Sequence, residues 1–195
     1  MNIFVDFDKT IAGGHSSGLA MQKDPMTEEN KIYIKQKISD WLSKGNNVII
    51  VTRGVDTEID SYLTKKLGIE HTMNSFSKGK LSVYAPDFDT FKINGDDEFA
   101  TLKTEYVNDF LQKSKTESKN SIFIDDTRIN VDKMKEKFSE MQCVVAEPGN
   151  YENTVSKIDD ELKKNCMGGF RKMKSRKLNK KIKKSKSKYF LNNKK

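Results

Sequence analysis

The sequence predicts an α/β protein with a parallel sheet that is covered by helices on both faces. Short apolar runs such as "NVIIV" at residues 47–51 lack the alternation of apolar and polar residues that marks a half-exposed strand, which is typical of parallel strands buried on both sides. These runs alternate along the chain with segments whose apolar residues recur at helical spacing. Strands that alternate with helices in this way favour a parallel sheet over a bundle or a sandwich.

Each strand is expected to coincide with an apolar run and to end where a polar or glycine-containing segment begins. The predicted strands cover residues 2–6, 47–52, 69–73, 121–126 and 143–146. The first helix is expected to follow Thr27, whose side chain can cap it, and to end at Gly45. The other helices are predicted at residues 56–67, 97–113, 130–138 and 151–164. Residues 74–96 are less regular, and we expect a hairpin or a small flap there.

Positive charge is concentrated at one end of the chain. Residues 166–195 contain 13 of the 36 Lys and Arg residues and no Asp or Glu. The other 23 basic residues share residues 1–165 with all 28 acidic residues, so this part carries a formal charge of −5. The basic segment has too few apolar residues to form a core. We therefore expect one globular domain at residues 1–165 and a disordered basic tail at residues 166–195.

Cysteine usage and hydropathy indicate a soluble intracellular protein. The two cysteines, Cys143 and Cys166, make neither a disulfide framework nor a metal-ligand pattern. The first residues lead directly into a strand that ends in acids, which differs from a signal peptide, and no apolar run reaches the length of a membrane span. We expect a location in the cytoplasm or nucleus, or in a virion, and no membrane partner.

Acidic residues follow the predicted strands at positions that a parallel sheet brings to one edge. Asp6 and Asp8 follow the first strand, and Asp125 and Asp126 end the fourth. Ligands of such sheets bind beyond the carboxyl ends of the strands, where these acids would meet. Carboxylates gathered without a cluster of histidines favour Mg²⁺, and Mg²⁺ in turn favours a phosphorylated substrate. Thr52, at the end of the second strand, offers a hydroxyl group to such a substrate.

In this order the motifs resemble the haloacid dehalogenase-like phosphohydrolase superfamily, which has a Rossmann-like sheet. The motifs are "DFDKT" at 6–10, a strand ending in "VT" at 51–52, a lysine on a helix, and a strand ending in "DD" at 125–126. The resemblance covers roughly residues 1–150. A single acidic motif would be weak, but four elements in order on the expected strand ends form a specific pattern.

The resemblance implies a role for each motif residue. Asp6 would be the nucleophile that forms an aspartyl-phosphate, and Asp8 would be the general acid and base. Magnesium would bind Asp6, Asp125, Asp126 and the backbone carbonyl of Asp8. The phosphoryl oxygens would be held by Thr52, Arg53 and Lys103. Asn130 stands where many members of the superfamily carry another acid, and its amide can orient a water molecule or a ligand.

Three assignments leave alternatives. Lys92 and Lys113 compete with Lys103 for the lysine role, and Lys103 is preferred because it lies 22 residues before Asp125. "PDFDT" at 86–90 imitates the first motif, but no strand precedes it and its threonine comes one position early, so a turn is expected. His15 follows the nucleophile in a glycine-containing loop, where it is either a substrate contact on a flap or an exposed loop residue.

The function expected from these features is a Mg²⁺-dependent phosphomonoesterase. The segments between the motifs leave no room for the large cap domain that many members of the superfamily close over small substrates, which favours a phosphate on a macromolecule such as a nucleic-acid end. The basic tail could bind such a polyanion or could simply increase solubility. The alternatives are a phosphatase acting on a small molecule or a nucleotide, and a non-catalytic nucleic-acid-binding protein on the same scaffold.

Overall fold

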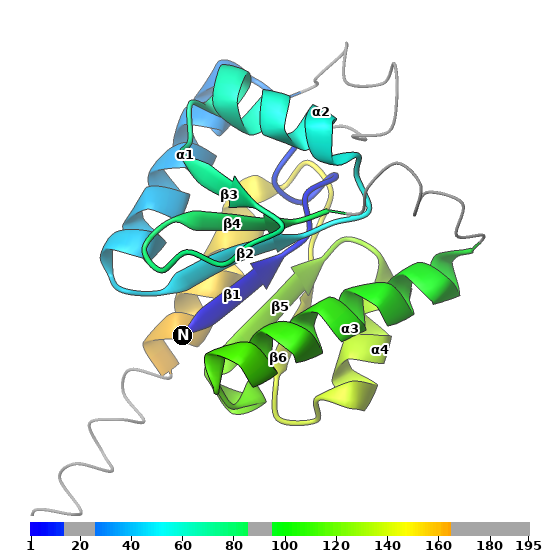
Figure 1. Ribbon diagram of the computed structural model, residues 1–195. Helices are drawn as coiled ribbons and strands as arrows, with labels where there is room; N and C mark the ends of the chain where they lie inside the picture. The colour runs from blue at the N-terminus through cyan, green and yellow to red at the C-terminus, as the bar shows by residue number, and fades with distance from the viewer. Residues whose placement is uncertain (14–25, 86–94, 165–195) are drawn as a thin grey trace, which may run out of the picture. The chain divides into compact units, whose positions relative to one another are not determined.

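The computed structural model describes residues 1–13, 26–85 and 95–164 (Figure 1). Within them, six strands form one sheet in the order β3-β4-β2-β1-β5-β6, and every pair of neighbouring strands is parallel. The strands are β1 (Asn2–Val5), β2 (Asn47–Val51), β3 (His71–Met73), β4 (Leu81–Tyr84), β5 (Ser121–Asp125) and β6 (Gln142–Val145). The predicted α/β class with a parallel sheet is confirmed. The predicted basic tail lies outside the described residues.

Helices connect the strands. They are α1 (Glu28–Ser43), α2 (Asp56–Ser61) with its π-helical continuation η2 (Tyr62–Leu67), α3 (Asp96–Ser114), the short 3-10 helix η4 (Ser118–Asn120) and α4 (Arg128–Lys137). Residues 151–164 are also helical. Thr27 caps α1 as expected, because its side chain accepts a hydrogen bond from the backbone of Asn30. Among the described helices, none combines the length and the apolar character that a membrane span requires.

The sheet has a core on each face. Side chains alternate along a strand, so Phe4, Ile49 and Phe123 point to one face, where they pack with Phe110 of α3 and Met134 of α4. The buried strand residues between them point to the opposite face. Figure 1 shows α3 and α4 together on the first face and α1 on the other. Both faces are therefore apolar, which explains why the strands are unalternated in sequence.

The prediction for residues 74–96 was wrong in one respect. Residues 81–84 form β4, which lies in the sheet between β3 and β2 and runs parallel to both, so the chain makes no hairpin with β3. The backbone of Asn74 has a φ of 47° and donates a hydrogen bond to the carbonyl of Val83 at 2.7 Å. The chain turns at this residue after β3, and β4 then runs parallel to β3. The motif "PDFDT" and residues 91–94 lie outside the described residues.

The predicted helix at residues 56–67 has two geometries. It begins as α2 and continues as the π-helix η2, which ends where Gly68 adopts a left-handed φ of 59°. Short π-helical segments inside helices are frequent near functional sites. The buried side of η2 includes Tyr62, whose ring makes an edge-to-face contact with Phe7, between the two acids of the first motif.

The contribution of the core face beneath α3 can be tested with two phenylalanines that contact the same ring. Phe4 and Phe76 both make edge-to-face contacts with Phe110, at centroid distances of 5.3 and 5.0 Å. Phe4 is fully buried, whereas Phe76 is 42% exposed. Phe4→Ala should lower the free energy of unfolding by about 3–5 kcal/mol because it leaves a cavity. Phe76→Ala should cost about 1 kcal/mol. Equal losses in a urea titration would contradict this account.

Candidate active site

Sheet topology brings the ends of β1 and β5 together. These strands are neighbours in parallel register, with Phe4 opposite Phe123, and the backbone of Asp6 donates a hydrogen bond to the carbonyl of Ile124 at 2.8 Å. Because side chains alternate, Asp6 and Asp125 fall on the same face as these two phenylalanines, the face that α3 covers. The two carboxylates are thus directed under a helix rather than into solvent.

Lys103 of α3 lies between the two carboxylates. Its Nζ is 2.5 Å from Asp6 Oδ1 and 2.6 Å from Asp125 Oδ2, and all three side chains are buried. The competing Lys113 is exposed and pairs with Asp109 on its own helix. The other competitor, Lys92, lies outside the described residues. Lys103 is therefore the lysine that the structure brings to the acids.

Burial and charge act against each other in this group. Burial raises the pKa of the Asp6 carboxyl well above its usual range; Lys103 opposes this change, and the neighbouring Asp125 adds to it. Burial alone would lower the pKa of Lys103, but the two carboxylates outweigh it, and the pKa of the lysine is raised. Lys103 is thus held as an ammonium ion. Its single positive charge does not offset the cost of burying the ionised form of Asp6.

Asp125 is the most fully bonded of these acids. Its Oδ1 accepts a hydrogen bond from the backbone of Thr127 at 2.9 Å, and Asn130 Nδ2 lies 2.9 and 3.0 Å from its two oxygens. Together with Lys103, these donors hold the carboxylate in one orientation. Asn130 was expected to orient a water molecule or a ligand, or to contact substrate. The structure places its amide on Asp125, where it orients a candidate metal ligand.

Three carboxylates could share one cation. Asp6, Asp125 and Asp126 each offer an oxygen, and these three atoms lie within 4.8 Å of one another. Asp126 is partly buried and accepts a hydrogen bond from the Thr127 hydroxyl at 3.2 Å. Asp8 is partly buried as well, and its side chain is not one of the three. That Asp8 would contribute its backbone carbonyl to a metal and keep its carboxyl group for proton transfer stays a prediction.

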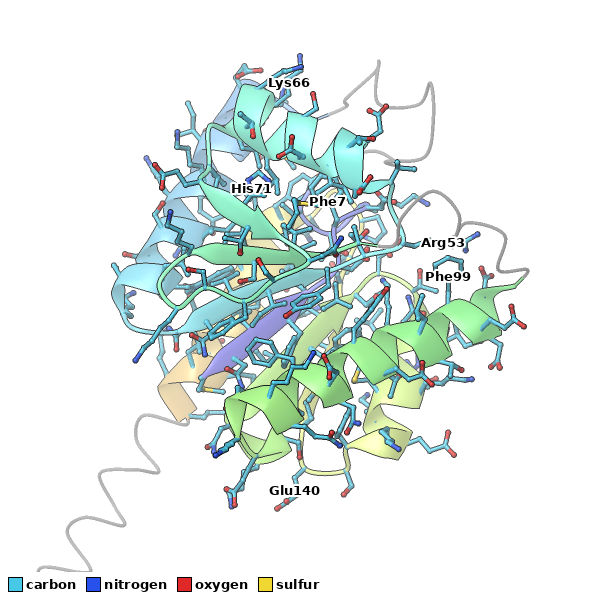
Figure 2. All side chains as sticks on the ribbon, in the orientation of Figure 1. Phe7, Arg53, Lys66, His71, Phe99 and Glu140 are labelled. Carbon is cyan, nitrogen blue, oxygen red and sulfur yellow. The ribbon has the colours of Figure 1, made fainter. Side chains whose placement is uncertain are left out.

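The segment that carries Asp6 and Asp8 is anchored by Phe7, which the sequence analysis did not single out. Phe7 is fully buried, and its ring centroid is 5.4 Å from that of Tyr62 at an angle of 90°. Figure 2 shows Phe7 in the interior beneath α2 and η2. Lys9 has a φ of 56°, and the backbones of Ile11 and Ala12 donate to the carbonyl of Phe7, which closes a tight turn. The signal in the sequence that could have identified Phe7 as an anchor is its place as an apolar residue between two acids.

The end of β2 supplies Thr52 and Arg53. Thr52 is buried, its backbone donates to the carbonyl of Tyr84 at 3.1 Å, and its hydroxyl oxygen accepts from the backbone of Gly54 at 3.0 Å. Arg53 is half-exposed and pairs with Asp96 at 2.8 Å, not with the acids of the cluster. The remaining candidate, His15, lies outside the described residues.

Comparison with solved structures identifies the fold. One similar structure is the N-terminal part of the protein BF1531 from Bacteroides fragilis, which contains a phosphatase domain and is complexed with Mg; the TM-score is 0.57 at 10% identity. The match covers 80% of this chain but only 39% of that longer one. Another is the HAD domain of the effector protein Lem4 from Legionella pneumophila, with a TM-score of 0.50, 14% identity, and coverage of 85% and 94%. The chain has the haloacid dehalogenase-like fold. No protein-family model and no curated protein sequence matches it.

The residues of this site fit a divalent cation. Three carboxylates and one ammonium group leave a formal charge of −2, which one divalent cation balances. The candidate ligands are all oxygen atoms, which Mg²⁺ prefers. The pKa of Asp6 is raised first by burial of its carboxyl group and further by the charge of Asp125, and Lys103 offsets only part of this. Asp6, Asp125 and Asp126 are therefore the side chains that would hold the ion.

Binding of Mg²⁺ should be measurable as stability, without any substrate. At a concentration 100 times its Kd, Mg²⁺ should raise the free energy of unfolding by about 2.7 kcal/mol. Asp126→Asn removes one charged ligand and should abolish most of this increase in thermal unfolding experiments. Asp132→Asn is the matched control, because Asp132 is an exposed acid paired with Arg128 on α4 and should leave the increase intact. An equal response of both variants would place the ion elsewhere.

Proposed function

We propose that the chain is a Mg²⁺-dependent phosphohydrolase that cleaves phosphomonoesters through a covalent intermediate on Asp6. The observation that carries this proposal is the buried ion cluster, in which Lys103 bridges Asp6 and Asp125 at the carboxyl edge of the sheet. Burying several charges together is unfavourable for stability when compared with apolar packing, so a catalytic role accounts for it better. The phosphatase domain of the similar protein BF1531 supports the same reaction class.

The first chemical step uses both acids of the first motif. A carboxylate oxygen of Asp6 attacks phosphorus and forms a new P–O bond, while the bond from phosphorus to the leaving oxygen breaks. Asp8 gives its proton to that oxygen, so the leaving group departs as a neutral alcohol. The anchoring of Phe7 supports this division, because it fixes the backbone between the two acids.

The second step regenerates the enzyme. Asp8, now a carboxylate, takes a proton from a water molecule, whose oxygen attacks phosphorus and releases inorganic phosphate from Asp6. Lys103 supplies a fixed positive charge beside Asp6, and Thr52 offers its hydroxyl to the phosphoryl oxygens. When bound, Mg²⁺ would supply further positive charge to the phosphoryl group. Asp125 and Asn130 keep Lys103 and the neighbouring acids in place.

A phosphate on a macromolecule, with a nucleic-acid end as the first candidate, is the substrate class we propose. In the described residues, the segment between β1 and β2 contains α1 alone, and the segment between β2 and α3 contributes two strands to the sheet. Neither segment forms a separate cap in those residues, which supports an open site able to receive the end of a large molecule. The 13 basic residues of the segment 166–195 favour a polyanionic carrier.

The nucleophile assignment predicts different kinetic defects for the two acids. Asp6→Asn should lower the Mg²⁺-dependent release of 4-nitrophenol from 4-nitrophenyl phosphate by at least about 1,000-fold. Asp8→Asn should still release a rapid burst of 4-nitrophenol, because this leaving group departs without a proton donor. Its steady-state rate should be low, because no base activates water. The aspartyl-phosphate should then accumulate and be trapped on Asp6 in intact-mass measurements. Undiminished turnover by Asp6→Asn would refute the proposed chemistry.

The nucleic-acid assignment predicts a role for the basic segment in binding. Removal of residues 167–195 should weaken binding of a 5′-phosphorylated oligonucleotide by more than about 10-fold at low salt and should flatten its salt dependence, because fewer counterions are released. Hydrolysis of 4-nitrophenyl phosphate by the truncated chain serves as the control and should be retained. A screen of 5′- and 3′-phosphorylated oligonucleotides, phosphopeptides and nucleotides then ranks the substrate classes. Higher turnover of phosphopeptides or nucleotides would reject the nucleic-acid end.

A further inference from the structure

Arg53 contacts two residues at the start of α3. It follows Thr52 at the carboxyl end of β2, and its guanidinium carbon lies 4.5 Å from the centroid of the Phe99 ring. Its Nη1 donates a hydrogen bond to Asp96 Oδ1 at 2.8 Å. Figure 2 shows Arg53 and Phe99 next to each other at one end of α3. The planar group is therefore stacked on one face and held along one edge.

The position of this stack relative to the reaction centre follows from helix geometry. Phe99 and Lys103 are four residues apart on α3, so their side chains lie on the same face of the helix, one turn apart. Lys103 reaches the acids, and Phe99 supports Arg53 one turn closer to the start of α3. Figure 1 shows that α3 starts at the carboxyl edge of the sheet. The guanidinium thus lies at the carboxyl edge of the sheet, on the face that α3 covers. It is displaced from Lys103 toward the start of α3.

Arg53 retains donors that can bind a ligand. A guanidinium carries five N–H groups, and one of them is used by Asp96. Within the described part of the chain, no other residue accepts a hydrogen bond from Arg53, and its side chain is 49% exposed. Stacking on the buried Phe99 restricts its rotation, so little freedom is lost when it binds an anion. The remaining edge of the fork matches a carboxylate or phosphate group.

We propose that Arg53, supported by Phe99 and Asp96, forms a subsite for a second anionic group on the leaving-group side of the substrate. This inference rests on the proposed phosphatase function and narrows its substrate class. The substrate is a phosphomonoester whose alcohol part carries another anionic oxygen close to the phosphate that is cleaved. Such a group is the first phosphodiester of an oligonucleotide that bears a terminal phosphate, or the second phosphate of a small bisphosphate. Arg53 binds and orients this group and takes no part in bond cleavage.

The test compares ligands that differ in one charge. Dithymidylate with a 5′-phosphate is paired with the same compound whose internal linkage is an uncharged methylphosphonate. Affinities are measured by calorimetry with Mg²⁺, using full-length protein that carries Asp6→Asn so that the ligand is not consumed. Adding Arg53→Gln should weaken binding of the charged compound by about 10- to 100-fold more than binding of the neutral one. Contributions from the basic segment cancel in this double-mutant comparison.

A second pair of ligands distinguishes the source of the anion. Thymidine 3′,5′-bisphosphate is compared with thymidine 5′-monophosphate in the same proteins. A differential effect of Arg53→Gln only in the dinucleotide pair assigns the subsite to an oligonucleotide, and an effect only in the nucleotide pair assigns it to a small bisphosphate. Arg53→Lys should restore part of the affinity, because it keeps the charge but loses the planar fork.

The same binding measurements include a control variant and a result that would refute the subsite. Arg128→Gln removes an arginine that is likewise paired with an exposed acid, Asp132, and should affect the two members of each ligand pair equally. If Arg53→Gln also weakens binding of the two members of each ligand pair equally, or if none of the ligands binds, the subsite is refuted. Because binding is measured without turnover, failure of the subsite is distinguishable from failure of the catalytic proposal, which the Asp6→Asn kinetics decide.

Discussion

The bridge from Lys103 to Asp6 and Asp125 constrains the rest of this structure. Two buried carboxylates side by side repel each other, and a buried ammonium group is unfavourable without partners. The three groups are compatible only if β1 and β5 are neighbours in this register and α3 covers their ends. The parallel sheet, the pairing of its central strands and the position of α3 are all needed to place these three charged groups. The rest of the core serves that placement by packing Phe4 and Phe123 beneath the same helix.

The sequence was sufficient to predict the edge at which the acids meet. Uninterrupted apolar strands imply a parallel sheet, and in such a sheet the residues that follow the strands share one edge. This rule alone predicts that Asp6 and Asp125 lie close together. The spacing between Lys103 and Asp125 also selected the lysine that the structure brings to these acids. The roles of these residues in catalysis stay predictions.

Other features depend on contacts that no local pattern encodes. The strand β4 was missed because "LSVY" is only four residues long and contains a polar residue, although Ser82 is fully buried in the sheet. The π-helical geometry of η2 depends on which carbonyl each N–H group reaches, and apolar spacing does not report it. The bond from Asn130 to Asp125 joins a helix to a strand end, so its partner could not be read from the chain. The stacking of Arg53 on Phe99 is equally non-local.

The central place of β1 in the sheet has a consequence for biosynthesis. Of the six described strands, β1 is synthesised first, and its pairing with β2 can form once residue 51 has left the ribosome. The other edge of β1 stays open until β5 is synthesised, more than 110 residues after the end of β1 itself. Such distant pairing slows folding and prolongs the exposure of an apolar strand edge. The nascent chain therefore carries an incomplete sheet until β5 is made, and the charged centre assembles only after residue 125 has emerged.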